Sequence, residues 1–181
     1  MSPITRSWLG MAALGTGITH IALGAGAPLP LAAPLILVGA TEIAWGVAAV
    51  VRDRLPLVAP ALVLFLLPLF GWALLITAAA VGGRPDFLAA LPFLPMATAA
   101  LMGLFLSAML AVHLRRRAST TSDDDPVPSP SAGRYLLGVL AGGLLVSGLT
   151  TPALASTSAG LEAVPHGTHG SSSSIDEHGG H

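Results

Sequence analysis

The chain has 181 residues, of which 53% are hydrophobic and only 9% are charged, and its mean hydropathy is +0.77. A soluble domain carries about a quarter charged residues, so this composition places the chain among membrane proteins. The net charge of −1 gives no electrostatic support to a nucleic-acid partner. Because the chain contains no Cys, disulfides, thiolate metal sites and Cys nucleophiles are excluded.

Apolar runs separated by short polar connections predict membrane-crossing helices, because about 20 mostly apolar residues span about 30 Å of hydrocarbon. Four runs satisfy this length, and they cover residues 8–27, 31–51, 57–81 and 88–114. The short connections favour antiparallel neighbours in an up-down bundle. The expected fold is therefore all-α, a polytopic membrane protein with a four-helix transmembrane bundle over residues 1–117.

The character of the chain changes after the bundle. Residues 118–134 contain three consecutive Asp and alternating Pro, and are expected to form a cytoplasmic linker with no core to bury. A fifth apolar run, residues 135–155, is expected to form a short transmembrane or signal-like helix. Residues 156–181 are rich in His, Gly and Ser, and this composition predicts a disordered extracytoplasmic tail.

The fifth run has two interpretations. Its strongly apolar core, residues 135–149, is short; Arg134 precedes it and the triplet Ala153-Leu154-Ala155 follows it. A basic start, a short apolar centre and an A-x-A triplet form the layout of a secretory signal sequence, so cleavage after Ala155 is one outcome. The other outcome is an uncleaved anchor of about 20 residues. Both outcomes deliver the tail to the same side of the membrane.

The basic residues indicate how the helices are oriented. If the N-terminus is cytoplasmic and five helices cross, seven of the eight basic residues lie inside and only Arg84 lies outside, in agreement with the positive-inside rule. All eight are Arg, which together with the excess of Ala, Leu and Gly indicates a high-GC bacterial gene. We therefore expect a multi-pass protein of the bacterial cytoplasmic (inner) membrane, with an extracytoplasmic C-terminus.

Four of the six His fall in the tail, as two pairs with the same spacing. Neutral imidazole is the commonest metal ligand among side chains, and the small residues between the two His let both rings turn toward one ion. Imidazole and carboxylate without thiolate suit Cu(II), Zn(II) or Ni(II), and the Irving–Williams order makes Cu(II) the tightest of these. The alternative is a solvated low-complexity tail that binds nothing. The expected metal ligands are His166, His169, His178, His181, Asp176 and Glu177.

His20 and Glu42 form a second candidate site, because they are the only ionisable side chains well inside the first four predicted spans. An ionisable residue in the membrane is costly unless it is paired, and is a functional hypothesis by default. At about 1.5 Å per residue, His20 lies about 10 Å and Glu42 about 16 Å from the outer end of their hairpin. The difference is about one helical turn, so the side chains are expected to meet. They fit a proton-carrying pair, a metal relay site or a structural hydrogen bond, and the neighbouring hydroxyls are candidates for a shared polar cluster: Thr16, Thr19 and Thr41.

Two segments carry a resemblance to a known pattern. Residues 17–24, GITHIALG, and residues 39–46, GATEIAWG, resemble small bacterial four-helix membrane proteins of unknown function, in which a His in the first helix precedes a Glu or Gln in the second. The resemblance covers roughly residues 8–114. It implies the four-helix fold and draws attention to His20 and Glu42, and it implies no activity.

Three functions are consistent with these features. The leading hypothesis is the binding or homeostasis of a transition metal, copper or zinc, at the extracytoplasmic face. One alternative is a structural or accessory subunit of a larger membrane complex, with the lipid bilayer and other membrane subunits as partners. Another is a small proton-coupled transporter that uses His20 and Glu42. The sequence contains no phosphate-binding loop, H-E-x-x-H or G-x-S-x-G motif, so we do not expect an enzyme.

Overall fold

The computed structural model describes residues 1–52, 54–82, 92–119 and 131–163. Within these ranges the secondary structure is entirely helical. Five of the helices are long and apolar enough to cross a membrane, which confirms the expected class of all-α, multi-pass membrane protein. The helices are α1 (Pro3–Ala25), α2 (Leu29–Val51), α3 (Val58–Gly82), α5 (Phe93–Ser119), α6 (Ala132–Ala155) and the single turn α7 (Ser158–Leu161).

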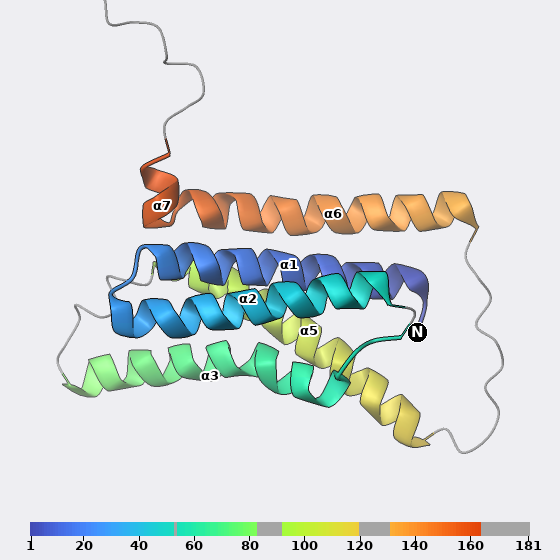
Figure 1. Cartoon of the computed structure of the whole chain (residues 1–181), viewed down its shortest axis with the longest axis horizontal. Coiled ribbons are helices and arrows are strands. Elements are labelled where there is room, and N and C mark those ends of the chain that lie inside the picture. The colour runs from blue at the N-terminus through green and yellow to red at the C-terminus, as the bar shows by residue number, and fades with distance from the viewer. Residues whose placement is uncertain (53, 83–91, 120–130, 164–181) are drawn as a thin grey trace, which may run out of the picture.

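Helix α1 lies at the centre of the arrangement (Figure 1). It packs against α2, α5 and α6, while α3 packs mainly against α5. Only three residues separate α1 from α2, so these two helices form an antiparallel hairpin. Helix α6 packs directly on α1, and the fifth apolar run is therefore part of the same packed group of helices.

The α1–α2 hairpin is held at a very short interhelical distance by Gly on both helices. A Cβ atom on Gly17 would lie 2.6 Å from the carbonyl oxygen of Gly39, and a Cβ on Gly39 would lie 2.5 Å from the carbonyl oxygen of Gly17. Gly10 and Gly46 approach each other in the same way one heptad further along. Small residues allow such close packing between membrane helices, so the two backbones are in direct contact at both levels.

A compact apolar core fills the end of the molecule where α2 joins α3. The indole of Trp45 on α2 packs edge-on against Phe65 on α3, with ring centroids 5.2 Å apart, and its Nε1–H donates to the carbonyl oxygen of Pro56 at 2.8 Å. Leu106 and Leu110 of α5 are fully buried in the same cluster. This core fixes α3 and α5 against the hairpin.

Aromatic side chains also join α6 to α1. Trp8 donates its indole N–H to the carbonyl oxygen of Gly138 at 2.7 Å, and a Cβ on Gly142 would lie 2.8 Å from the same indole nitrogen. The hydroxyls of Ser7 and Tyr135 are 3.3 Å apart. The Gly138-x-x-x-Gly142 motif of α6 therefore lies against α1, with the Ile4 side chain beside Gly138 and the Trp8 side chain beside Gly142.

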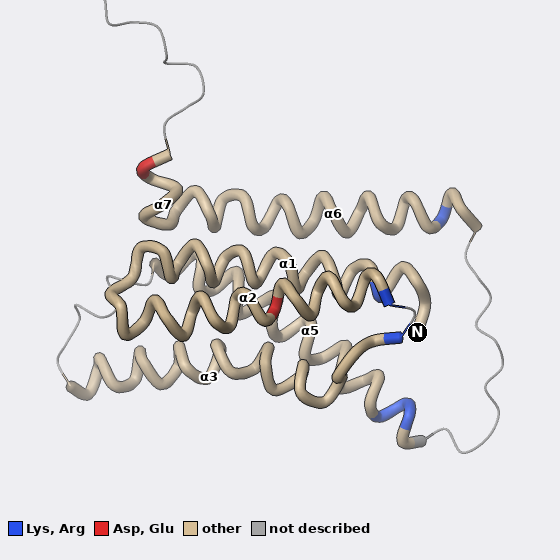
Figure 2. Tube along the Cα trace, in the orientation of Figure 1, with Lys and Arg blue, Asp and Glu red and all other residues tan. Residues whose placement is uncertain are grey.

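The charges of the described residues are segregated along the helices (Figure 2). Arg residues occupy the end at which α1, α3 and α6 begin and α2 and α5 end. Glu42 lies midway along α2, and Glu162 follows α7 at the opposite end. This distribution leaves one long apolar zone between the two ends.

Helix α6 runs through the A-x-A triplet and then turns back on itself. The amide of Ser156 donates to the carbonyl oxygens of Pro152 and Ala153 at 3.2 and 3.3 Å. Thr157 is 1% exposed, and its hydroxyl both donates to the carbonyl oxygen of Leu154 and accepts from the amide of Gly160. The segment after Ala155 is thus wound and packed against α1 and α6.

The helix boundaries differ from the expected ones by a few residues. Helix α1 begins earlier than residue 8, because the Ser2 hydroxyl caps it and Pro3 occupies its first turn. Helices α5 and α6 extend slightly into the expected linker, whose centre lies outside the described residues. The tail from residue 164 onward also lies outside them, so its expected disorder stays a prediction.

We expect Gly39→Ala to destabilise the hairpin by about 1–3 kcal/mol, because the new methyl group would meet a backbone carbonyl that has no free space to move. Gly148→Ala is the matched control, because nothing lies within 4 Å of a Cβ at that position. Thermal unfolding in detergent measures the difference. Equal midpoints for the two variants would contradict the direct backbone contact.

We also expect the mature protein to keep its tail. Proteolysis concentrates at exposed loop tips, whereas the bond after Ala155 joins the last residue of α6 to Ser156, whose amide still donates to carbonyl oxygens of the helix. The intact mass of the membrane-extracted protein should correspond to a chain that includes residues 156–181. A mass that lacks this segment would show that the A-x-A triplet is cut.

Candidate functional site

His20 and Glu42 meet in the interior of the hairpin. The Nδ1 atom of His20 on α1 lies 2.7 Å from Oε2 of Glu42 on α2. The two residues are 1% and 0% exposed. The contact expected from their depths therefore forms, and it forms in the apolar zone between the two ends of the molecule.

The helix geometry explains why the two side chains reach each other. Gly17 lies against the α2 backbone between Gly39 and Ile43, which puts Glu42 about one turn further from the hairpin connection than His20. Side chains on a helix tilt toward its N-terminus. In an antiparallel hairpin His20 therefore tilts away from the connection and Glu42 tilts toward it, so the two side chains close the gap.

Pairing is the condition for burying these groups. A single charged side chain at the centre of a membrane costs roughly 2.5–3.5 kcal/mol on insertion scales, and a buried ion pair that loses one partner leaves the other uncompensated. The hydrogen bond uses one atom of each partner. His20 Nε2 and Glu42 Oε1 are buried and have no hydrogen-bond partner in the structure, so the pair retains one open atom on each side.

The expected polar cluster around the pair does not form. The hydroxyls of Thr16 and Thr19 donate to carbonyl oxygens of their own helix, each at 2.8 Å. Thr41 does the same on α2 and is exposed. A Thr hydroxyl in a helix can donate a hydrogen bond to the carbonyl oxygen four residues earlier. These three hydroxyls do so, and they are therefore not directed at His20 or Glu42.

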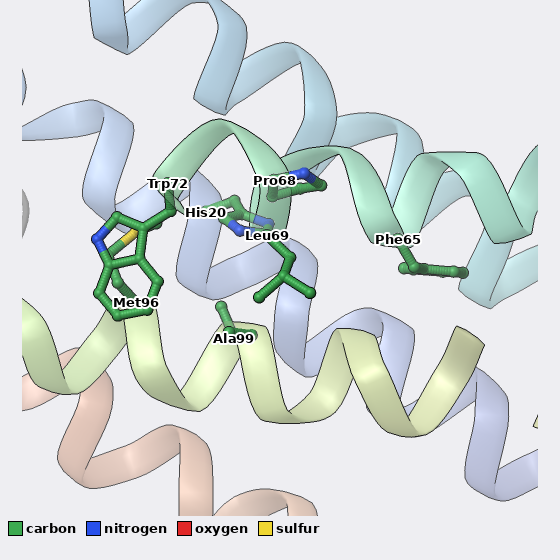
Figure 3. A pocket seen from close by; sticks show the side chains of 8 residues that line it. His20, Phe65, Pro68, Leu69, Trp72, Met96 and Ala99 are labelled. Carbon is green, nitrogen blue, oxygen red and sulfur yellow. The ribbon is translucent and has the colours of Figure 1, made fainter. Parts of the chain in front are cut away.

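A cavity of about 10 Å³ lies beside His20 (Figure 3). The His20 ring points from α1 toward α3 and α5, which supply the rest of the wall. Met96 contributes a thioether and Trp72 an indole ring, and the other lining groups are hydrocarbon. The full lining is His20, Phe65, Pro68, Leu69, Trp72, Met96, Ala99 and Ala100.

The sequence pattern did not indicate that Met96 and Trp72 belong to this site. Met96 opens the buried stripe of α5 that continues through Ala99 and Met102, and a stripe at this spacing is typical of ordinary core packing. Nothing in the sequence alone shows which buried Met faces His20. That information requires the way α3 and α5 pack across the hairpin.

A larger apolar groove of about 230 Å³ lies next to the small cavity, between α2 and α3. Pro34 and Val38 line it on α2, and Gly71 lines it on α3. Pro68, Trp72 and Met96 line both the groove and the cavity. These three residues therefore form the boundary between the cavity beside His20 and the groove.

The expected metal ligands of the tail lie outside the described residues, so their geometry stays a prediction: His166, His169, His178, His181, Asp176 and Glu177. Within the described part of the chain, no group of three or more His, Asp or Glu side chains comes together. The site that can be described is therefore the hairpin pair and the cavity beside it.

The pair has two chemical capacities. An imidazole whose Nδ1 is bonded to a carboxylate has its ring orientation fixed, and its Nε2 is left available for a metal ion. The same two groups exchange a proton readily, because each has an acceptor atom that can take one. The metal-binding capacity depends on the open Nε2 atom of His20, whereas a proton relay would use the open atom of each partner.

Comparison with known proteins adds no further information about this site. No family model, no curated protein and no solved structure matches the chain. The resemblance of residues 17–24 and 39–46 to small four-helix membrane proteins therefore stays an expectation.

Proposed function

We propose that this protein binds a transition metal, copper or zinc, as part of metal homeostasis at a bacterial cytoplasmic membrane. The observation that carries the proposal is the His20–Glu42 pair. A carboxylate holds one nitrogen of a buried imidazole at 2.7 Å while the other nitrogen has no partner. This is the outer-shell arrangement that orients histidine ligands at metal sites.

The proposed orientation puts the N-terminus in the cytoplasm and the tail outside. Its support is the gathering of Arg at one end of the described helices together with the positive-inside rule. With this orientation, the two histidine pairs of the tail would capture Cu(II) or Zn(II) at the outer face. Helix α7 contacts α1 beside the hairpin connection, so the tail starts at the end of the bundle closer to His20.

Titration calorimetry of Cu(II) and Zn(II) into the full-length protein in detergent tests this function. We expect binding with a Kd below about 1 µM. A full-length variant with all four tail His replaced by Ala should lose most of this Cu(II) and Zn(II) binding, because the hairpin pair offers these ions only one open imidazole nitrogen. The replacements avoid truncation, which would remove the packed turn α7. Millimolar binding, or equal binding by both proteins, would contradict metal capture by the tail and favour the accessory-subunit alternative.

Proton-coupled transport is the second candidate function. The observation that favours it is that the pair retains an open atom on each partner, Nε2 of His20 and Oε1 of Glu42. A proton shared across the hydrogen bond has a further acceptor available on either side. Intramembrane carboxylate and imidazole groups are typical of proton relays.

We expect Glu42→Gln to abolish any proton flux, because an amide retains the hydrogen bond and cannot carry the proton. Vesicles with the protein and an internal pH-sensitive dye measure the decay of an imposed pH gradient. The control is Thr41→Ala, which changes an exposed neighbour on the same helix. Decay at the rate of protein-free vesicles for the unmodified protein would rule out proton flux through the pair.

A further inference from the structure

The cavity beside His20 has an unusual combination of walls. Its one open polar atom is His20 Nε2, which is buried and without a hydrogen-bond partner. A thioether from Met96 and the indole ring of Trp72 complete the part of the wall that is not aliphatic or phenyl. Figure 3 shows the Met96 sulfur beside the Trp72 ring, with the indole nitrogen on the side away from His20.

A water molecule is a poor occupant of such a space. A cavity of about 10 Å³ has room for one small guest, and a buried water normally makes two to four hydrogen bonds. Among the side chains that line the space, His20 is the only one with a buried hydrogen-bonding atom that has no partner. A water molecule would therefore find few open side-chain partners there.

We propose that this cavity binds the soft monovalent cation Cu(I), with His20 Nε2 and Met96 Sδ as its ligands. Thioether sulfur selects Cu(I) over harder divalent ions, and imidazole also suits copper. Both ligands are on the wall of one small cavity, and Cu(I) accepts low coordination numbers. This inference deepens the proposed function, on which it rests, by naming the oxidation state of the ion and the second ligand.

The cost of burying charge supports a monovalent ion. Cu(I) would bring one positive charge into the apolar zone beside the Glu42 carboxyl group, whereas Zn(II) or Cu(II) would bring two, and charges are costly there.

The test uses full-length protein in which the four tail His are replaced by Ala, so that the cavity is the only proposed site. Cu(I) is added without oxygen in competition with a colorimetric Cu(I) chelator, and X-ray absorption reports the scattering atoms around copper. We expect one equivalent of bound Cu(I) with nitrogen and sulfur scatterers. Ag(I), which has the same charge and softness and is not readily oxidised, should compete for the site.

Three substitutions in this background test the ligands. Met96→Leu conserves volume, and should remove the sulfur scatterer and weaken binding more than roughly tenfold. Glu42→Gln should weaken binding by about 10–100-fold, as for other outer-shell partners of metal-bound imidazole. Met102→Leu is the control, because Met102 is buried on the same helix but does not line the cavity. Equal thermal unfolding of the two Met variants verifies that both are folded.

The outcomes separate this inference from the proposed function. Sulfur scattering that survives Met96→Leu, or Cu(I) affinity that is equal in the Met96 and Met102 variants, would overturn the cavity site. Absence of bound Cu(I) in this background would overturn it as well. In either case Cu(II) or Zn(II) binding by the unmodified tail would still support metal homeostasis, and its absence would remove that function separately.

Discussion

The contact between the backbones of α1 and α2 is the constraint on which the rest of the structure depends. A methyl group on Gly17 would overlap the carbonyl oxygen of Gly39, and a methyl group on Gly39 would overlap the carbonyl oxygen of Gly17. At this distance the two helices cannot slide or rotate without a clash, so the register of the hairpin is fixed. That register puts His20 and Glu42 one turn apart with converging side chains, and α3, α5 and α6 pack around the result.

The apolar surroundings of His20 and Glu42 make each of the two residues depend on the other. Removal of either charged partner would leave the other without compensation in a region that solvates charge poorly. The pair also uses only Nδ1 of the imidazole, so the ring is oriented while Nε2 stays open. Helices α3 and α5 supply the rest of the cavity wall beside His20. That wall contains a thioether and an indole ring and no side-chain hydroxyl group.

Much of this arrangement could be predicted from the sequence, and the reasons are physical. Apolar runs of about 20 residues predict spanning helices, and a depth count along two adjacent helices was enough to predict that His20 and Glu42 meet. Contacts between distant segments were not predictable in this way. The position of Met96 in the cavity depends on how α5 crosses the hairpin. The hydroxyl of Thr16 donates to a carbonyl oxygen of its own helix and not to the His20–Glu42 pair. The periodicity of apolar side chains shows which face of a helix is buried, but it does not show which other helix packs against that face.

The packed turn α7 has a consequence for the tail that follows it. Ser158 sits against Gly26 at the hairpin connection, so the last described residue, Ala163, is anchored to that end of the bundle. His166 follows only three residues later, within about 11 Å of the anchor at full extension. A ligand tethered so closely has an effective concentration in the millimolar range at the mouth of the hairpin. Under the metal-binding function proposed above, the tail would act as a local reservoir, in which an ion that dissociates is recaptured before it diffuses away.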